Sequence, residues 1–168
     1  GNDRYVVEMH GQGASCWYGL GMLLDRAGDD QYRAVFNAQG SAVHISAGLL
    51  LDEAGNDRYT LAGDNDREGR GQGAAHDWAV GILADRGGND LYRARAGAQG
   101  VGCTTGLGIL LERAGDDRYE GETGHLQGAG RRDRELPSLG ILVDTGGTDR
   151  YSTDRHDGAV WVTSDRGV

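Results

Sequence analysis

The stretch DRAGDDQY at residues 25–32 decides the fold, because its pattern Asp-x-x-Gly-x-Asp-x-Tyr recurs along the whole chain. Copies start at Asp25, Asp52, Asp85, Glu112 and Asp144, a half copy with Asp3 and Tyr5 opens the chain, and Asp165-Arg166-Gly167 closes it. The spacing from the first acidic residue to the tyrosine never varies within a copy. A unit repeated in this way is typical of proteins built from stacked structural repeats.

A second marker, Gln-Gly, locates the differences in length between the repeats. Its glutamines are Gln12, Gln39, Gln72, Gln99 and Gln127, which follow the preceding block tyrosine by 7, 7, 13, 7 and 8 residues. The additional residues fall in two polar segments, 63–70 and 131–137. We therefore expect two longer loops on an otherwise constant unit of about 27 residues.

Each unit holds three short apolar segments that indicate β-strands. One has the form Gly-apolar-Leu-apolar-Asp, as at residues 81–85, and another is Tyr-Arg-Ala, as at 32–34. The third follows Gln-Gly. Runs this short, bounded by glycine, favour strands over helices. Glycine at this density would also cost about 1 kcal/mol per helical position. The sequence predicts an all-β protein.

A unit of this size cannot bury its own apolar face, but stacked copies can share one core. We predict a repeat β-solenoid, similar to a parallel β-helix, with five to six coils in a single domain spanning 1–168. The predicted coils cover approximately residues 1–27, 28–54, 55–87, 88–114, 115–146 and 147–168. Antiparallel hairpins, as in a propeller, are the alternative, although propeller repeats run nearer to about 40 residues.

The chain is acidic and rich in glycine. Its 168 residues include 31 Gly, 1 Pro and no Lys, and its net charge at pH 7 is -9. Such a surface repels nucleic acid and anionic lipid and attracts cations, so we expect no nucleic-acid partner. No apolar run approaches the roughly 20 residues of a membrane span. Cys16 and Cys103 are too few for a disulfide framework and lack the spacing of a zinc site.

Stacking would align the acidic residues of the block in two neighbouring columns. One would contain Asp3, Asp30, Asp57, Asp90, Asp117 and Asp149, and the other Asp25, Asp52, Asp85, Glu112, Asp144 and Asp165. Like charges about 5 Å apart repel by roughly 3 kcal/mol per pair at an effective dielectric of about 20. Calcium takes about 6 to 8 oxygen ligands in flexible geometry and would offset this repulsion. We predict that these twelve carboxylates are calcium ligands.

The residue after each block glycine extends the predicted ligand set. It is Asn2, Asp29, Asn56, Asn89, Asp116 or Thr148, and therefore always carries a side-chain oxygen. We count the first five with the carboxylates as calcium ligands. In a competing interpretation these turns are Asx-turns bonded to their own backbone, and Arg4, Arg58, Arg118 and Arg150 neutralise the column. Gln31 and Leu91 replace that arginine in two copies, which favours calcium.

The block resembles the hemolysin-type calcium-binding repeat, whose pattern is Gly-Gly-x-Gly-x-Asp. The matching stretches are Arg86-Gly87-Gly88-Asn89-Asp90-Leu91-Tyr92 and Thr145-Gly146-Gly147-Thr148-Asp149. The resemblance covers the turn, which is about a third of each unit. It implies a secreted protein that folds on meeting calcium.

Three further columns follow from the stacking. The tyrosines should pack and stack on one another, and the marker glutamines should form side-chain amide ladders. The fourth residue after the marker glutamine is Cys16, Val43, His76 or Cys103, which would place a Cys beside a His as nucleophile and base. No third orienting residue is identifiable, and His44 falls one position off this column. We therefore predict that the protein is not an enzyme.

The sequence thus favours a calcium-binding structural solenoid outside the cell or at its surface. The last residues, Asp165-Arg166-Gly167, form the first part of a block, and Gly1-Asn2-Asp3-Arg4-Tyr5 at the start form the second part. The end of one copy could therefore continue into the start of the next, and we expect head-to-tail self-association into a filament. The alternative is a carbohydrate-binding or carbohydrate-processing β-helix, with a glycan as partner. Trp17, Tyr18 and Trp78 are the candidate aromatic residues for such a site.

Overall fold

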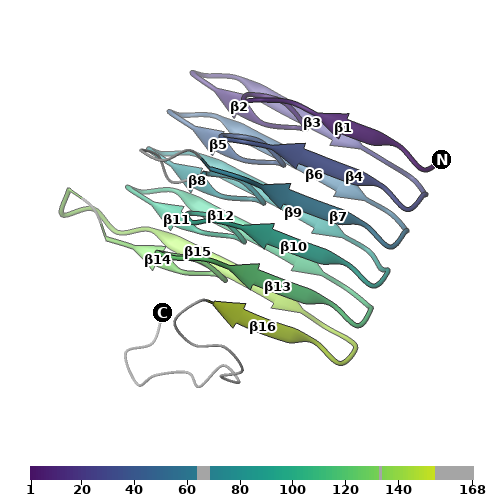
Figure 1. Ribbon diagram of the computed structural model, residues 1–168. Coiled ribbons are helices and arrows are strands. Elements are labelled where there is room, and N and C mark those ends of the chain that lie inside the picture. Colours follow the sequence, from purple (N-terminus) through teal and green to yellow (C-terminus); the bar gives the residue numbers. More distant parts are fainter. Residues whose placement is uncertain (64–68, 133, 154–168) are drawn as a thin grey trace.

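The computed structural model describes residues 1–63, 69–132 and 134–153, and their only regular secondary structure is β (Figure 1). Sixteen strands within these ranges form three sheets. The tyrosine sheet has six strands, in the order β1 (Arg4–Val6), β4 (Gln31–Ala34), β7 (Arg58–Leu61), β10 (Leu91–Ala94), β13 (Arg118–Gly121) and β16 (Arg150–Thr153). Asp165 and the end of the last predicted coil lie outside the described residues.

The other two described sheets have five strands each. The short-strand sheet contains β2 (Ser15–Cys16), β5 (Ala42–Val43), β8 (Ala75–His76), β11 (Gly102–Cys103) and β14 (Gly130–Arg131). The leucine sheet contains β3 (Leu20–Leu24), β6 (Ala47–Asp52), β9 (Val80–Asp85), β12 (Leu107–Glu112) and β15 (Leu139–Asp144). One strand from each sheet in succession, such as β4, β5 and β6, forms a rung, and the rungs stack along one direction (Figure 1).

The pairing register matches equivalent positions of the repeat. Every described strand pair is parallel, and Tyr5 pairs with Tyr32, which pairs with Tyr59. Likewise Glu112 pairs with Asp85. This arrangement is consistent with a β-solenoid, and the antiparallel hairpins of the alternative prediction are not found among these pairs. The all-β prediction is confirmed for the described residues.

The corner between the tyrosine sheet and the short-strand sheet is made by the Gln-Gly marker. Gln39 and Gly40 both have left-handed backbone conformations, with φ of 55° and 73°. A Cβ atom on Gly40 would lie well within 3.0 Å of the carbonyl oxygen of Ile82 in the next rung. Only glycine permits this approach of two backbones, which explains why Gly follows Gln in every copy.

The core consists of columns of identical side chains. Neighbouring tyrosine rings have centroids 4.6–5.0 Å apart and planes within 6° of each other, so the predicted tyrosine stacking is confirmed. Leu50, Leu83 and Leu110 pack against the rings and are completely buried. Aromatic stacking at this spacing adds to the hydrophobic burial of the rings.

The predicted ladder of glutamine amides is wrong. Gln39 Nε2 instead donates to two backbone carbonyl oxygens, of Tyr32 at 3.0 Å and of Thr60 in the next rung at 3.1 Å. Gln72 and Gln99 repeat the same pair of bonds in their own rungs. Tyr32 and Thr60 lie inside β4 and β7, so the amide of Gln39 bonds strand carbonyls of two neighbouring rungs and ties the corner to both.

The outer face of the leucine sheet is apolar. Side chains alternate along these strands, so that Leu50 and Asp52 of β6 point into the core. The residues between them face outward and are also apolar, such as Leu49 in β6 and Ile109 in β12. At the β3 end, Leu20 is 78% exposed and Met22 is 66% exposed. A contiguous apolar face of this kind is uncommon on proteins that act alone. No helix that could cross a membrane occurs in the described part of the chain.

Candidate cation-binding columns

Two columns of carboxylates line the edge of the core where the leucine sheet turns into the tyrosine sheet. We call the first the strand-end column, because its members end or directly follow the strands of the leucine sheet. They are Asp25, Asp52, Asp85, Glu112 and Asp144. We call the second the turn column, because each member directly precedes the first residue of a strand in the tyrosine sheet: Asp3, Asp30, Asp57, Asp90, Asp117 and Asp149. The predicted alignment of these eleven residues is therefore seen.

Both oxygens of a strand-end carboxylate have hydrogen-bond partners. In Asp85, Oδ1 accepts the backbone N–H of Gly87 at 3.0 Å, and Oδ2 accepts the hydroxyl of Tyr59 at 2.7 Å. Asp52 is held in the same way by Ala54 and Tyr32. The bond from a carboxylate to the N–H two residues on is the Asx-turn that the competing interpretation predicted.

The turn carboxylates have a partner for only one oxygen. Oδ1 of Asp57 accepts the backbone N–H of Asp30 at 2.6 Å, and Oδ1 of Asp90 accepts that of Asp57 at 2.6 Å. Their other oxygens are buried and make no hydrogen bond. This holds for Oδ2 of Asp30, Asp57, Asp90 and Asp117. A buried anionic oxygen without a partner is strongly unfavourable unless positive charge reaches it.

The two columns approach each other so closely that carboxylates gather in groups of three. Oxygens of Asp57, Asp85 and Asp90 lie within 4.8 Å of one another, and those of Asp90, Glu112 and Asp117 do so in the next rung. All five residues are buried. The same grouping recurs at Asp30 with Asp52 and Asp57, and at Asp3 with Asp25 and Asp30.

Burial and mutual repulsion disfavour ionisation of these groups. Burial, together with the charge of the neighbouring Asp85, raises the pKa of Asp90 to about 9. The pKa values of Asp57 and Glu112 rise to about 8, again mainly through burial. The pKa values of Asp85 and Asp117 rise to about 6. The columns therefore need protons or a cation to persist at neutral pH.

Arginine does not supply this charge in the way that the competing interpretation proposed. Arg58 and Arg118 are exposed and alternate with the buried Tyr59 and Tyr119 along their strands, so they point away from the columns.

The residues after the block glycines also face outward. Oδ1 of Asp29 accepts the N–H of Asn56 at 2.9 Å, and further bonds of this kind run through Asn2, Asn89, Asp116 and Thr148.

The structure thus separates the predicted ligands into two sets. Eleven carboxylates lie together in the columns, whereas Asn2, Asp29, Asn56, Asn89 and Asp116 form an exposed ladder whose side-chain oxygens hold the backbone of the next rung. The donor set of the columns suits calcium, because hard cations select oxygen ligands and a bound ion would hold the unpartnered Oδ2 atoms in their ionised form. The turn carboxylates would hold the ion, with the strand-end carboxylates beside them.

Sequence reasoning missed a second group of ligand atoms. His44, His76 and Asp77 come together at the corner after the short-strand sheet, and their side-chain atoms lie within 4.8 Å of one another. Burial lowers the pKa of His76 below its ordinary value. The sequence did contain an indication of this group. Because Val43 aligns with His76, the next residue His44 aligns with Asp77.

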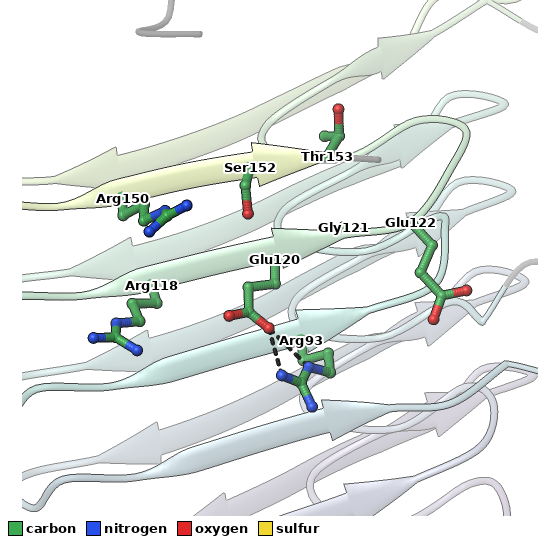
Figure 2. A pocket seen from close by; sticks show the side chains of 8 residues that line it. All are labelled: Arg93, Arg118, Glu120, Gly121, Glu122, Arg150, Ser152 and Thr153. Atoms are coloured by element: carbon green, nitrogen blue, oxygen red, sulfur yellow. Dashed lines mark hydrogen bonds and ion pairs between the residues drawn. The ribbon is translucent and has the colours of Figure 1, made fainter. Parts of the chain in front are cut away.

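A hollow of about 540 Å³ lies on the outer face of the tyrosine sheet (Figure 2). Its lining is charged and polar, and within it Arg93 and Glu120 point toward one another and form an ion pair at 2.6 Å. No aromatic side chain is among the described residues that line it. Exposed aromatic residues gather instead at the corner after the short-strand sheet, where Trp17, Tyr18 and Trp78 are each at least 66% exposed.

The chain was compared with protein-family models, curated proteins and solved structures. None of the three comparisons gives a match. The function must therefore be inferred from the residues and their geometry.

Proposed function

We propose that the chain is a calcium-binding structural β-solenoid of five to six coils, with about 27 residues in each coil and two longer loops. The observation that carries the proposal is the row of buried turn carboxylates, each with one oxygen that lacks a hydrogen bond. Calcium ions along the columns would neutralise this charge and join consecutive rungs. Binding would then be coupled to folding, because the columns exist only in the stacked chain.

Protons alone would neutralise only part of the columns at neutral pH. With pKa values of about 6, Asp85 and Asp117 would lose their protons at pH 7 and leave buried negative charge. Outside the cell, calcium is abundant enough to fill even sites with dissociation constants of about 10⁻⁴ to 10⁻³ M. We therefore place the protein outside the cell or at its surface, with a structural rather than an enzymatic role.

Self-association fits the same role. The apolar outer face of the leucine sheet offers a surface for contact, and β1 is the outermost strand of the tyrosine sheet. Unpaired strand edges invite pairing with another chain. We propose that copies associate head to tail through these edges into a filament, in a contact that does not close into a ring.

The test is a titration of the chelator-stripped protein with CaCl₂ at pH 7.5, followed by calorimetry in two buffers with different ionisation enthalpies. We expect several ions per chain, release of protons into the buffer, and a higher melting temperature. Light scattering in parallel should increase as filaments grow. Absence of binding heat together with an unchanged melting temperature would refute the calcium proposal, and constant scattering would refute the filament.

The aromatic corner favours a second candidate function, which is glycan binding. Trp17 and Tyr18 follow β2, Trp78 follows β8 two rungs away, and all three are exposed, so their aromatic faces can contact the apolar faces of sugars. Titration with oligosaccharides should then quench the tryptophan fluorescence, and Trp78→Ala should remove the response. An unchanged emission spectrum across a panel of acidic and neutral glycans would exclude this candidate.

A further inference from the structure

The parallel register brings two histidines and an aspartate together at one corner of the fold. His76 is the last residue of β8, and Asp77 follows it directly. His44 follows β5, whose Val43 pairs with His76. The backbone N–H of His44 donates to the carbonyl of His76 at 3.0 Å, and both His44 and Asp77 have left-handed φ angles, of 59° and 56°. These corners place His44 level with Asp77 in the next rung.

The three side chains converge on one oxygen. Oδ2 of Asp77 lies 3.0 Å from Nδ1 of His44 and 3.1 Å from Nδ1 of His76. In a tetrahedral zinc site with bonds of about 2.0–2.1 Å, neighbouring ligand atoms are about 3.3 Å apart. The observed separations are close to that value. The other oxygen of Asp77, Oδ1, is the one that lies 3.6 Å from Arg134 Nη1.

His76 carries the independent observation that points to a ligand. Its side chain is buried, and its Nδ1 makes no hydrogen bond, although the distance to Asp77 Oδ2 would suit an ion pair. The distance is short enough, but an N–H in the ring plane would not point at the oxygen. The opposite nitrogen, Nε2, lies 3.4 Å from the hydroxyl of Thr104. A hydrogen bond on the second nitrogen is the usual way in which a metal-binding imidazole is oriented.

We propose that His44, His76 and Asp77 bind a divalent transition-metal ion, for which zinc is the probe. Two imidazoles and one carboxylate are a common ligand set for such ions, with the fourth position open to water or to a further ligand. The site is distinct from the carboxylate columns, because nitrogen donors do not suit calcium. His44 is 35% exposed, so the ion reaches the site from solvent. The ring of Trp17 stacks on His44 with centroids 4.4 Å apart and reports binding by fluorescence.

The test uses the full chain without a polyhistidine tag, stripped with chelator and then held in excess calcium so that the carboxylate columns do not compete. Titration with ZnCl₂ should give one high-affinity ion per chain by calorimetry, with a matching change in tryptophan emission. His44→Gln and Asp77→Asn each remove a ligand and should weaken the affinity by more than roughly ten-fold. Thr104→Val removes the bond to His76 and should weaken it roughly ten-fold.

His125→Gln is the matched control, because His125 is an exposed histidine outside this corner. It should bind zinc as the unmodified chain does. An unchanged melting temperature of His44→Gln in calcium would show that the loss of affinity is not a loss of fold. The proposal is overturned if no single-ion event is seen, or if His44→Gln and His125→Gln change the affinity equally.

Discussion

Replacing Asp90 by asparagine tests whether buried charge limits the stability of the columns. Oδ1 of Asp90 accepts the N–H of Asp57, and an asparagine oxygen can keep this bond. The amide nitrogen would take the place of the unpartnered Oδ2, beside Asp85 and Glu112. The substituted side chain would therefore donate to its carboxylate neighbours as a protonated Asp90 does, but it would do so at every pH.

The size of the effect follows from the pKa of Asp90, which is about 9 in the fold and about 3.9 in the unfolded chain. Because the folded value is the higher one, the stabilisation is complete below about pH 4 and is lost as the pH rises toward 9. Each pH unit in this window costs about 1.4 kcal/mol. Without calcium, Asp90→Asn should therefore stabilise the chain by on the order of 5 kcal/mol at pH 8 and by about 1 to 2 kcal/mol at pH 5.

The assay is thermal unfolding followed by far-ultraviolet circular dichroism at pH 5 and pH 8, with chelator or with calcium. A gain of this size corresponds to roughly 10 to 20 °C in melting temperature. Calcium should raise the melting temperature of the variant less than that of the unmodified chain, because the variant lacks one carboxylate ligand. Asp116→Asn is the control, since Asp116 is exposed and its Oδ1 also accepts an N–H from the next rung.

One result would refute the reasoning. If Asp90→Asn lowers the melting temperature by the same amount at both pH values, whether or not calcium is present, then the columns carry no cost of buried charge. An equal effect of Asp116→Asn would show that any gain comes from the net charge of the chain rather than from the columns.

Two further substitutions test the hydrogen bonds and the close packing of the rungs. Tyr92→Phe keeps the ring stack but leaves the buried Glu112 without its hydroxyl donor, so urea unfolding should show a loss of about 1 to 3 kcal/mol, whereas the exposed Tyr18→Phe should change the stability little. Gly147→Ala places a Cβ well within 3.0 Å of a backbone carbonyl oxygen of the preceding rung and should destabilise the fold by about 4 kcal/mol or more, measured by the same unfolding curves. Gly146→Ala, with its nearest contact at 3.4 Å, should keep the stability close to that of the unmodified chain.

The parallel stacking of equivalent residues could be predicted from the chain, because equal spacing between the blocks leaves few other arrangements. Block tyrosines at a constant distance from the block acids can stack only if the strands pair in register, and Tyr32 does pair with Tyr59. Periodic Gly and short apolar runs were enough to argue against helices. The two acidic columns and the repulsion between them followed from the same register.

The direction of each side chain could not be predicted from the sequence, because it depends on the backbone angles at the corners. The sequence alone could not show that Asn56 faces solvent while the adjacent Asp57 is buried, since both residues can bind a cation. Nor could it show that glutamine would bond to carbonyls, because only the left-handed corner at Gln39 brings its amide to the carbonyl oxygens of Tyr32 and Thr60.

The sequence by itself therefore determined which residues share a column, and the tertiary structure decided which atoms in those columns lack partners. His44 shows the difference most clearly. Its offset by one residue from His76 looked like a mismatch in the sequence. The left-handed corners place it level with Asp77 instead, within 3.0 Å of that carboxylate. Contacts across rungs join residues 27 to 33 positions apart, so only the folded backbone fixes which of their atoms meet.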